Sequence, residues 1–600
     1  MKNTTLDNIV YLIKKIFNLD KVIFLLIGIY ILILALAPFL DILFPKFLLD
    51  ELSTNLDIKN ILYILIIYSA LSFLIFPFIE YIGCIINAKQ TNSRMKILFE
   101  VQNKVFKIPF KYTEDVDILN KKETVIRSLS GFDSGIQSLL NEFVLLISSL
   151  LSLVGYISIL ASLNIILVLY LLVNIFVMYR IVAKFSNYEV NKTNDIWINN
   201  REVNYYMNIM NDFSYGKDIR LLNLKDLIIY KVKNSINISM NMLKQIKKNN
   251  FKVIFIDLTL SFFREGFVYF YLIYMFLNNK ILIGDFVMFF SAIAGFTELM
   301  NSIARYISSI NSKNTNIKDI KDFLNLEDLE SCDNSNKSNE KFCLSSLEAP
   351  YKITFDKVSF KYPNSNKLIL DELSLTINQG ERLAIVGENG CGKTTLIKLL
   401  TRLYEPTSGK IYINNIDINN IPIDSYNKLI SVVFQDYKIL AFSVIDNIAL
   451  SDSDVDYTKL IKSMKDSGIY EKIERLPKKE NTLMQKRIDD SGIELSQGEK
   501  QKLAIARAIY KSGEIIILDE PTAALSPQSE EQVYKEFNNM TKNKTSIFIS
   551  HRLASTHFCD NIAFIKNGKI TEYGSHDFLI DLGNDYAKMY NIQSQYYDVK

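Results

Sequence analysis

The chain has 600 residues and a nearly balanced charge, with 68 Lys and Arg against 65 Asp and Glu and a formal net charge of +3. This balance argues against a nucleic-acid partner held by bulk positive charge. Hydrophobic residues make up 49% of the chain and the mean hydropathy is +0.12, which predicts a membrane component. The five cysteines are dispersed and the histidines number three, so neither a disulfide framework nor a zinc site is expected.

Long uncharged stretches lie in the first half of the chain. Residues 22–40 and 61–79 each approach the roughly 20 residues that a helix needs to cross a bilayer. The first of them is too long for the apolar region of a cleavable signal peptide. The uncharged stretch 143–179 is nearly twice a bilayer span, so we expect a hairpin that turns near Ser162 and Asn164. We predict six spans in all, at about residues 22–40, 61–82, 141–161, 164–182, 251–277 and 281–310.

The loops between the predicted spans differ in their Lys and Arg content. Residues 87–137 and 183–250 are rich in these residues, whereas the opposite loops are nearly bare. The positive-inside bias therefore predicts that both termini and the two long loops of a multi-pass membrane protein are cytosolic. The long loops are charged and poor in Gly and Pro, so we expect the span helices to continue below the membrane.

Charged residues interrupt the interior of the fifth predicted span, among them Asp257, Arg264 and Glu265. Asp257 and Arg264 are seven positions apart and share one helix face. Charged groups at membrane depth are tolerated when they pair or face a water-filled cavity. The residues are therefore either an internal ion pair that holds the spans together or part of a cavity wall for a polar or charged substrate.

A new composition begins after a polar segment of low complexity, residues 331–346, which we interpret as part of a linker over 331–350. Short β-rich runs then alternate with helical stretches. This alternation predicts an α/β domain with a mostly parallel sheet. The expected strands are Lys352–Tyr362, Arg382–Val386, Ile430–Phe434, Glu514–Leu518 and Thr545–Ser550.

A phosphate-binding loop follows the strand Arg382–Val386. Residues 387–394 read GENGCGKT, a full match to GxxxxGK[ST], and a helix is expected over Thr395–Leu403. The glycines let consecutive backbone N–H groups point at phosphate oxygens at a helix N-terminus. Lys393 would neutralise phosphate charge and the Thr394 hydroxyl would ligate Mg²⁺.

Acidic residues end a second buried strand. Residues 514–520 read EIIILDE, so Asp519 is placed to hold the hydrated Mg²⁺ and Glu520 to polarise an attacking water. Both assignments depend on the phosphate loop, because two acids after a strand are more often a solvated strand end. His551 follows the strand Thr545–Ser550, and we prefer a γ-phosphate contact over a merely satisfied polar side chain.

The order of these motifs resembles that of ATP-binding cassette transporters, and the whole chain is similar to an exporter-type half-transporter. The diagnostic segment is 495–508, LSQGEKQKLAIARA, which looks like the signature motif of that family and the helix after it. By this resemblance Tyr362 stacks on adenine, and Gln435 touches Mg²⁺ and the attacking water. The catalytic set is then Glu520, His551 and Gln435, and the metal set is Thr394, Gln435 and Asp519. The nucleotide-binding set is Tyr362, Gly387, Glu388, Asn389, Gly390, Cys391, Gly392, Lys393, Thr394, Thr395, Ser496, Gln497, Gly498 and Glu499.

The resemblance implies a multidomain membrane protein: a six-helix, all-α transmembrane domain over residues 1–330, then the linker, then an α/β P-loop ATPase domain over 351–592. It also implies that two ATPase domains meet head to tail, each phosphate loop facing the signature of the partner. The chain has one of each, so it needs a second copy of itself or a related half-transporter, and we favour the homodimer. ATP closes the pair and hydrolysis releases it, which drives alternating access. Segments near 112–120 and 212–222 are candidates to transmit the motion.

Four positions bear on how such a site works. Gln497 stands where the signature usually has Gly, Glu499 where it usually has Gln, and Ser526 where the loop that couples the two sites usually has Asp. These departures bear on coupling, whereas nucleotide binding is not affected. Cys391 lies within the phosphate loop at a helix N-terminus, which predicts a stabilised thiolate whose alkylation blocks ATP hydrolysis.

The substrate is open to several interpretations. Because only about twenty residues, without Cys or His, precede the first span, we expect no fused leader-cleaving protease domain. The signature form resembles that of exporters of modified antimicrobial peptides, which favours a bacteriocin-type peptide as substrate. A multidrug or lipid exporter is the alternative, and a non-transporting membrane ATPase that acts as a sensor or resistance module is another. An importer is disfavoured, because importers of this family commonly keep spans and ATPase on separate chains.

Overall fold

The computed structural model describes residues 5–54, 58–131, 135–329, 349–363, 365–451, 454–486, 489–520, 537–538, 540–550 and 553–595. The chain divides into two compact units. The first comprises Met1–Phe106 and Val116–Leu326, and the second comprises Lys107–Asp115 and Glu327–Lys600. Nothing in the sequence pattern predicted that the short segment Lys107–Asp115 would belong to the second unit. Most of the predicted linker and its neighbours, residues 330–348, lie outside the described residues.

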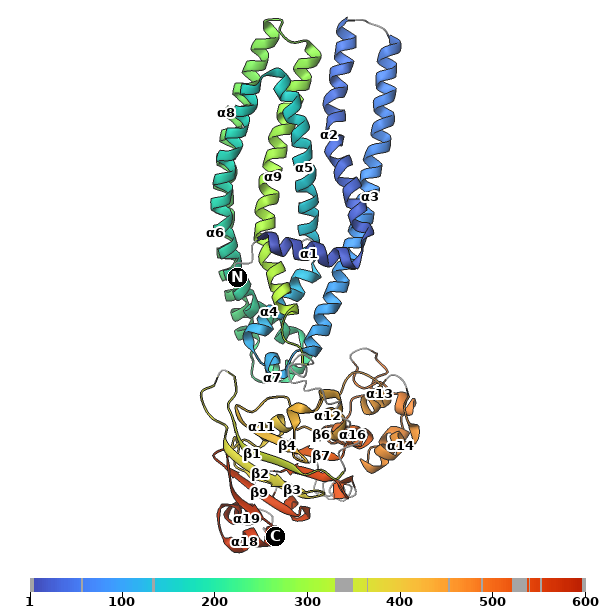
Figure 1. Cartoon of the computed structure of the whole chain (residues 1–600), viewed down its shortest axis with the longest axis vertical. Coiled ribbons are helices and arrows are strands. Elements are labelled where there is room, and N and C mark those ends of the chain that lie inside the picture. Colours follow the sequence, from blue (N-terminus) through green and yellow to red (C-terminus); the bar gives the residue numbers. More distant parts are fainter. Residues whose placement is uncertain are drawn as a thin grey trace. The chain divides into compact units, whose positions relative to one another are not determined.

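The described part of the first unit is built from helices, several of them very long (Figure 1). They are α1 (Thr5–Leu19), α2 (Val22–Thr54), α3 (Ile58–Lys107), α4 (Val116–Ser130), α5 (Ile136–Leu163), α6 (Ile165–Asn211), η2 (Phe213–Tyr215), α7 (Gly216–Leu221), α8 (Lys225–Leu277) and α9 (Ile283–Leu324). Helices α3, α6 and α8 continue far beyond the apolar stretches. The prediction that the two long loops are helical extensions of the spans is therefore confirmed.

The predicted hairpin in the long uncharged stretch is also confirmed. Helix α5 ends at Leu163, and Asn164 is the N-cap of α6, where its side chain accepts a hydrogen bond from the Ile166 N–H at 2.9 Å. Four described helices are long and apolar enough to cross a membrane: Val22–Ser53, Ile58–Lys107, Ile136–Leu163 and Ile283–Leu324. The stretch Ile165–Asn174 is apolar but shorter. The count of six spans stays a prediction.

Two apolar clusters hold the helices of the first unit together. One gathers α1, the start of α2, and α3, α4, α5 and α9 around residues such as Leu12, Ile97 and Phe323. The other gathers α2, α5, α6, α8 and α9 around residues such as Leu171 and Phe296. Large apolar side chains also point outward along the predicted spans, which is the pattern expected for helices in contact with lipid.

The second unit contains two sheets. A six-stranded sheet has the order β10-β9-β3-β8-β7-β6, parallel except for the antiparallel edge strand β10. A four-stranded antiparallel sheet has the order β2-β1-β4-β5 and was not predicted. The strands are β1 (Ile353–Phe360), β2 (Leu370–Ile377), β3 (Arg382–Gly387), β4 (Ser408–Ile413), β5 (Ile416–Asp417), β6 (Ile430–Val433), β7 (Ile515–Asp519), β8 (Thr545–Ile549), β9 (Asn561–Lys566) and β10 (Lys569–Gly574).

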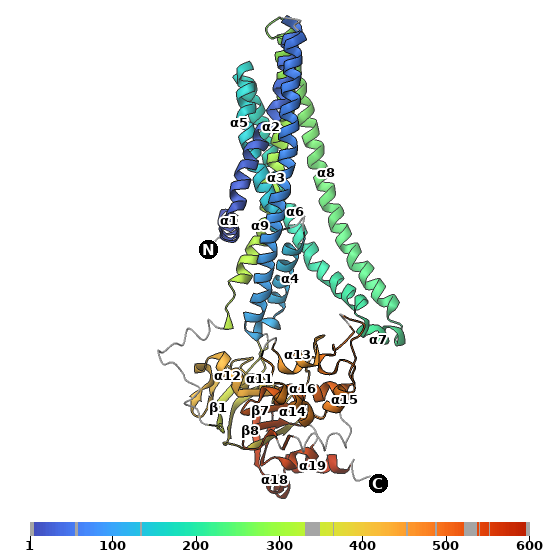
Figure 2. The same ribbon diagram turned by 90° about the vertical axis from the view of Figure 1, so that its right-hand side faces the viewer.

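Helices flank these sheets (Figure 2). They are η1 (Phe110–Thr113), α11 (Lys393–Leu400), η4 (Ile418–Asn420), α12 (Ile423–Leu429), α13 (Val444–Ala449), α14 (Tyr457–Asp466), α15 (Tyr470–Glu474), η5 (Lys479–Asn481), α16 (Gln497–Lys511), η6 (Leu553–Phe558), α18 (His576–Leu582) and α19 (Asp585–Gln595). All five predicted strands and the predicted mostly parallel sheet are confirmed. Strands β7 and β8 are buried at every position, as continuous apolar runs require in a parallel sheet. Because β3, β7 and β8 are parallel neighbours, the residues after them meet at one edge of the sheet.

Candidate nucleotide-binding site

The phosphate loop connects β3 to α11, as predicted. Gly392 precedes the helix with φ of +111°, and a Cβ there would lie 2.7 Å from a Leu370 side-chain atom, so the position requires glycine. No side chain caps α11, which leaves the N–H groups of its first turn available to an anion. Glu388, Asn389 and Gly390 in the middle of the loop are exposed. The loop is therefore open to solvent at the point where phosphate would bind.

Lys393 is folded back onto the loop. Its side chain is buried, and Nζ donates hydrogen bonds to the carbonyl oxygens of Gly387 at 2.9 Å and Glu388 at 3.0 Å. These bonds hold the ammonium group inside the curve of the loop. An ammonium held there is placed to meet phosphate oxygens that bind to the same loop.

Asp519 ends β7 beside the phosphate loop. The residue is 1% exposed, and neither carboxylate oxygen has a hydrogen-bond partner of normal geometry among the described residues, although the Thr394 side chain interacts with it. Burial, with a smaller contribution from the charge of Glu520, raises the pKa of Asp519 to about 6. A buried carboxylate beside a hydroxyl fits a hard divalent cation such as Mg²⁺.

Glu520 and Gln435 meet at the same edge of the sheet. Gln435 Nε2 donates a hydrogen bond of 2.7 Å to Glu520 Oε2, and the Glu520 backbone N–H donates to the Ile549 carbonyl at 3.0 Å. Glu520 has φ of +50°, a left-handed conformation that is costly for a residue with a Cβ. The structure therefore brings together two of the three predicted catalytic residues. The third, His551, lies outside the described residues, and so does Ser526.

Tyr362 lies next to the phosphate-loop helix. Its hydroxyl is 3.0 Å from Thr395 Oγ1, and its ring packs edge-on against Phe360 and Tyr404 with centroid distances of 5.1 and 5.4 Å. The structure thus joins the predicted adenine platform to Thr395, another predicted nucleotide-binding residue. Tyr404 was not predicted, because its role depends on contacts that a local motif does not contain.

The signature segment opens α16 with a reciprocal cap. Ser496 N donates to Glu499 Oε2 at 2.8 Å, and Glu499 N donates to Ser496 Oγ at 3.3 Å. Glu499 also pairs with Lys472 at 3.2 Å, and the backbone carbonyl of Gln497 accepts a hydrogen bond from the Tyr437 hydroxyl at 3.2 Å. Neither Lys472 nor Tyr437 was predicted. The departure at Glu499 therefore has a local structural role as helix cap and ion-pair partner.

The expectation of a reactive thiolate at Cys391 is wrong. The side chain is 8% exposed, and burial raises the pKa of the thiol despite the charge of Lys393, whose Nζ lies 4.0 Å from Sγ. The helix N-terminus alone suggested a stabilised thiolate, but removal of the group from water has the larger effect. The thiol is therefore protonated and shielded at neutral pH.

The charged residues of α8 were left with two interpretations. Arg264 is 3% exposed, donates a hydrogen bond to Ser261 Oγ at 3.0 Å and lies 3.9 Å from a Glu265 oxygen. Asp257 lies within electrostatic range of Arg264 and of Arg305 on α9. The burial of Arg264 favours the internal network over a cavity wall, because a covered guanidinium cannot contact a substrate without helix movement.

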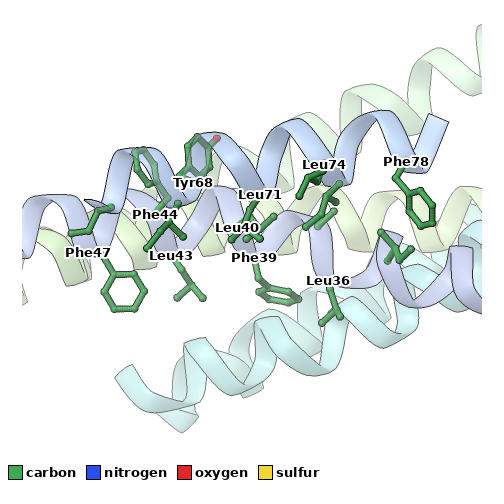
Figure 3. A pocket seen from close by; sticks show the side chains of 15 residues that line it. Leu36, Phe39, Leu40, Leu43, Phe44, Phe47, Tyr68, Leu71, Leu74 and Phe78 are labelled. Carbon is green, nitrogen blue, oxygen red and sulfur yellow. The ribbon is translucent and has the colours of Figure 1, made fainter. Parts of the chain in front are cut away.

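An apolar groove of about 710 Å³ lies between α2 and α3 (Figure 3). Phe39 and Leu43 from α2 and Leu71 and Phe78 from α3 are among its lining residues. Tyr68 is the one lining residue with a polar group, and its hydroxyl donates a hydrogen bond to Asp41 at 3.0 Å. The groove offers apolar contact and hardly any polar group that could select a ligand.

Comparison with known proteins supports one family. Residues 370–523 match the family model described as ABC transporter. An ATP-dependent lipid A-core flippase of Chromobacterium violaceum is 36% identical over 242 residues, which are 40% of this chain and 41% of the flippase, so the match spans well under half of that relative.

Two further matches extend over nearly the whole chain. A subtilin transport ATP-binding protein of Bacillus subtilis is 28% identical over 594 residues, 96% of this chain and 92% of that protein. The solved structure of a bacterial Atm1-family ABC exporter with ATP bound has a TM-score of 0.80 at 19% sequence identity, over 99% of each chain, and thereby shows the fold. Residues 370–523, which hold the phosphate loop and the signature helix, are therefore an ATPase domain of the ABC transporter family, and the whole chain has the fold of an exporter in which membrane helices precede that domain.

Proposed function

We propose that this chain is one half of an ATP-driven exporter of the bacterial cytoplasmic membrane and that its substrate is a peptide. The observation that carries the ATP-dependent part is the meeting, at one edge of the sheet, of the phosphate loop, the buried carboxylate of Asp519 and the Glu520–Gln435 pair. Apolar helices long enough to span a membrane lie in the same chain. ATP hydrolysis can therefore be coupled to movement across the membrane within one protein.

Each residue of this edge has a role in the proposed reaction. Lys393 exchanges its two carbonyl contacts for phosphate oxygens, while the open N–H groups of α11 orient the same phosphates. Glu520 accepts a proton from the attacking water, and the Gln435 amide holds its carboxylate in place. The left-handed conformation of Glu520 fixes where that carboxylate lies at the strand end.

Thr394 and Asp519, with Gln435 nearby, are the residues that would hold Mg²⁺. When bound, the ion supplies positive charge that offsets the negative charge of the β- and γ-phosphates. Asp519 would contribute its carboxylate in the ionised form, and the charge of the ion would offset the burial and the nearby Glu520, which raise the pKa of Asp519 in the protein alone.

The proposed working form is a homodimer with two ATP sites, each built from the phosphate loop of one copy and the signature of the other. The described contacts within one chain support this arrangement, since none of them joins Ser496 or Gly498 to the phosphate loop. ATP binding would close the pair and hydrolysis would open it, which moves the binding site from the cytosol to the outside. Both termini and the ATPase domain would be cytosolic.

The test of the ATPase is made on the purified chain in lipid nanodiscs. We expect MgATP hydrolysis by the wild type and a loss of at least about a hundredfold in Glu520→Gln, with MgATP still bound. Equal, background-level hydrolysis by both proteins would overturn the homodimer, because a competent site would then need an unlike partner.

The peptide substrate is supported by the subtilin transport protein, which matches nearly the full length of this chain. The flippase match covers only two fifths of each protein and bears less on the membrane domain. The test is ATP-dependent uptake of a labelled, modified antimicrobial peptide into inverted vesicles. Uptake that needs ATP and fails in Glu520→Gln supports export, whereas binding without uptake would indicate a sensor or resistance module.

A lipid or multidrug exporter is the second candidate, favoured by the apolar groove between α2 and α3. Its wide apolar lining suits an acyl chain or a drug rather than a charged peptide. Substitution of Leu71 by Gln would place an amide in the groove. Reduced lipid or drug transport with normal basal ATP hydrolysis would favour this second candidate over the peptide.

A further inference from the structure

Three aromatic rings surround one lysine side chain beside the predicted adenine platform. Lys398, on α11, places its Nζ 5.8 Å from the ring centre of Phe110, 5.6 Å from that of Tyr362 and 5.6 Å from that of Tyr404. All three distances lie within the range of cation–π attraction. Phe110 comes from the segment Lys107–Asp115, far away in sequence, and packs on the main core of the second unit.

Glu114 of the same segment contacts both Lys398 and Tyr404. Its carboxylate pairs with Lys398 Nζ at 3.4 Å and accepts a short hydrogen bond from the Tyr404 hydroxyl. Tyr404 is 6% exposed, and its pKa is raised by burial and by the bond to Glu114. The hydroxyl therefore stays protonated and remains the donor at physiological pH.

The cluster bears directly on the orientation of Tyr362. The Tyr362 hydroxyl is tied to Thr395, while its ring is packed between Phe360 and Tyr404 and faces Lys398. A ring that stacks on a base binds through its face, so its affinity depends on the angle at which the ring is held. Phe110 and Glu114 hold the two groups, Lys398 and Tyr404, that set this angle.

We propose that Phe110 and Glu114 are positioning residues for nucleobase recognition, so that a loop between α3 and α4 sets the affinity of the Tyr362 platform for the base of ATP. This role rests on the proposed function, in which Tyr362 stacks on adenine. Because coupling between two sites is reciprocal, binding of the base to Tyr362 also stabilises the docked form of Lys107–Asp115.

The experiment compares two ligands that share a triphosphate but differ in the base. Dissociation constants for MgATP and for magnesium tripolyphosphate are measured on the full-length protein in nanodiscs, by competition with a fluorescent nucleotide. We expect Phe110→Ala and Glu114→Gln to weaken MgATP two- to fivefold and to leave tripolyphosphate unchanged. Lys111→Ala is the matched control, since Lys111 is exposed in the same segment and its ammonium lies over Tyr112 instead.

A double-mutant cycle separates positioning from general disruption. In a Tyr362→Ala background, Phe110→Ala is expected to have no further effect on MgATP affinity. Hydrogen exchange gives a second measure: amides of residues 107–115 are expected to exchange more slowly with MgATP than with tripolyphosphate.

The proposal is overturned if Phe110→Ala weakens the binding of MgATP and tripolyphosphate equally, or if its effect on MgATP affinity persists in the Tyr362→Ala background. It is also overturned if hydrogen exchange in residues 107–115 is the same with MgATP as with tripolyphosphate. Failure of the proposed function looks different, because the wild type would then show no MgATP binding or hydrolysis. If the wild type binds and hydrolyses MgATP while Phe110→Ala and Glu114→Gln leave MgATP affinity unchanged, the positioning role is wrong and the proposed function stands.

Discussion

The two helix N-termini of the proposed nucleotide site differ in whether a side chain caps the first turn. At α11 the preceding residue is Gly392, and no side chain caps the helix. At α16 the hydroxyl of Ser496 and the carboxylate of Glu499 close a reciprocal box over the first turn. An open terminus binds phosphate directly, whereas a capped one must share or release its cap first. If the proposed function holds, this difference predicts that ATP binds at α11 and that α16 responds to it.

Removal of the lysine at the open terminus gives the largest expected effect. Lys393→Ala removes the charged donor that would contact the phosphates, and charge-assisted hydrogen bonds of this kind contribute about 1.5–3 kcal/mol each. We therefore expect the dissociation constant for MgATP to rise by roughly ten- to a hundredfold, measured by competition with a fluorescent nucleotide. Lys410→Ala is the control, because that lysine is exposed and pairs with Asp417 at 3.2 Å, a residue outside the phosphate loop. An unchanged constant for Lys393→Ala would contradict the assignment of binding to α11.

Burial of the Asp519 carboxylate beside the open terminus predicts a pH-dependent loss of folding stability. Because the folded protein raises the pKa of Asp519 from 3.8 to about 6, its contribution to stability is present below pH 4 and is lost as the pH rises through 6. At pH 7.5 without Mg²⁺, we expect Asp519→Asn to raise the free energy of unfolding by up to about 3 kcal/mol. Magnesium and nucleotide should reverse the order, stabilising the wild type more than the variant in thermal denaturation.

Asp560 is the control with the opposite sign. The pKa of Asp560 is lowered because hydrogen bonds and the charge of Arg382, 2.7 Å away, outweigh burial. The contribution of Asp560 to folding stability is present above its pKa in the unfolded chain and is lost as the pH falls through its lowered pKa in the folded protein. Asp560→Asn is therefore expected to lower the melting temperature at pH 7.5. If Asp519→Asn and Asp560→Asn shift the melting temperature in the same direction, the contrast between the two carboxylates is wrong.

The sequence was sufficient for the parts of the fold and site that depend on local chemistry. The loop GENGCGKT directly follows β3, and Asp519 and Glu520 lie at the end of β7, because phosphate and metal ligands must sit at strand ends and helix starts. The apolar stretches likewise predicted α2, α3, α5 and the turn at Asn164, since bilayer thickness fixes their length.

The features of the fold and site that the sequence did not predict depend mostly on contacts between distant parts of the chain. Glu114 and Tyr404 are 290 positions apart, so no local pattern could pair them. The pairing of β1 with β4 was missed for the same reason, since β2, β3 and α11 lie between them in the sequence, whereas β1 and β2 are consecutive strands. At Cys391 the sequence pointed to the helix N-terminus, but the degree of burial, which decides the pKa, is a property of the packed structure.

Removal of the cap at α16 should have a smaller effect of another kind. Ser496→Ala deletes the hydroxyl that accepts the Glu499 N–H, and loss of such a cap costs about 1 kcal/mol. We expect faster hydrogen exchange in the first turn of α16 and unchanged affinity for MgATP in the absence of hydrolysis. Ser443→Ala is a matched control, because Ser443 closes the same kind of box on α13, away from the signature. A large fall in MgATP affinity in Ser496→Ala would mean that the capped terminus also carries initial binding.

The smallest effect is expected from the lysine that neutralises the cap. Lys472 pairs with Glu499 at 3.2 Å, and both side chains are partly exposed, so the pair contributes about 0.5 kcal/mol or less to stability. Without Lys472 the Glu499 carboxylate would face the phosphates of an ATP held by the partner copy with its charge unbalanced. Lys472→Ala should then raise the KM for MgATP about twofold at low salt, and 0.5 M salt should remove the difference. Glu499→Gln keeps an acceptor for the cap without the charge, so the double variant should recover the wild-type KM. If Lys472→Ala is equally impaired with Gln at position 499, the charge of Glu499 is not what Lys472 balances.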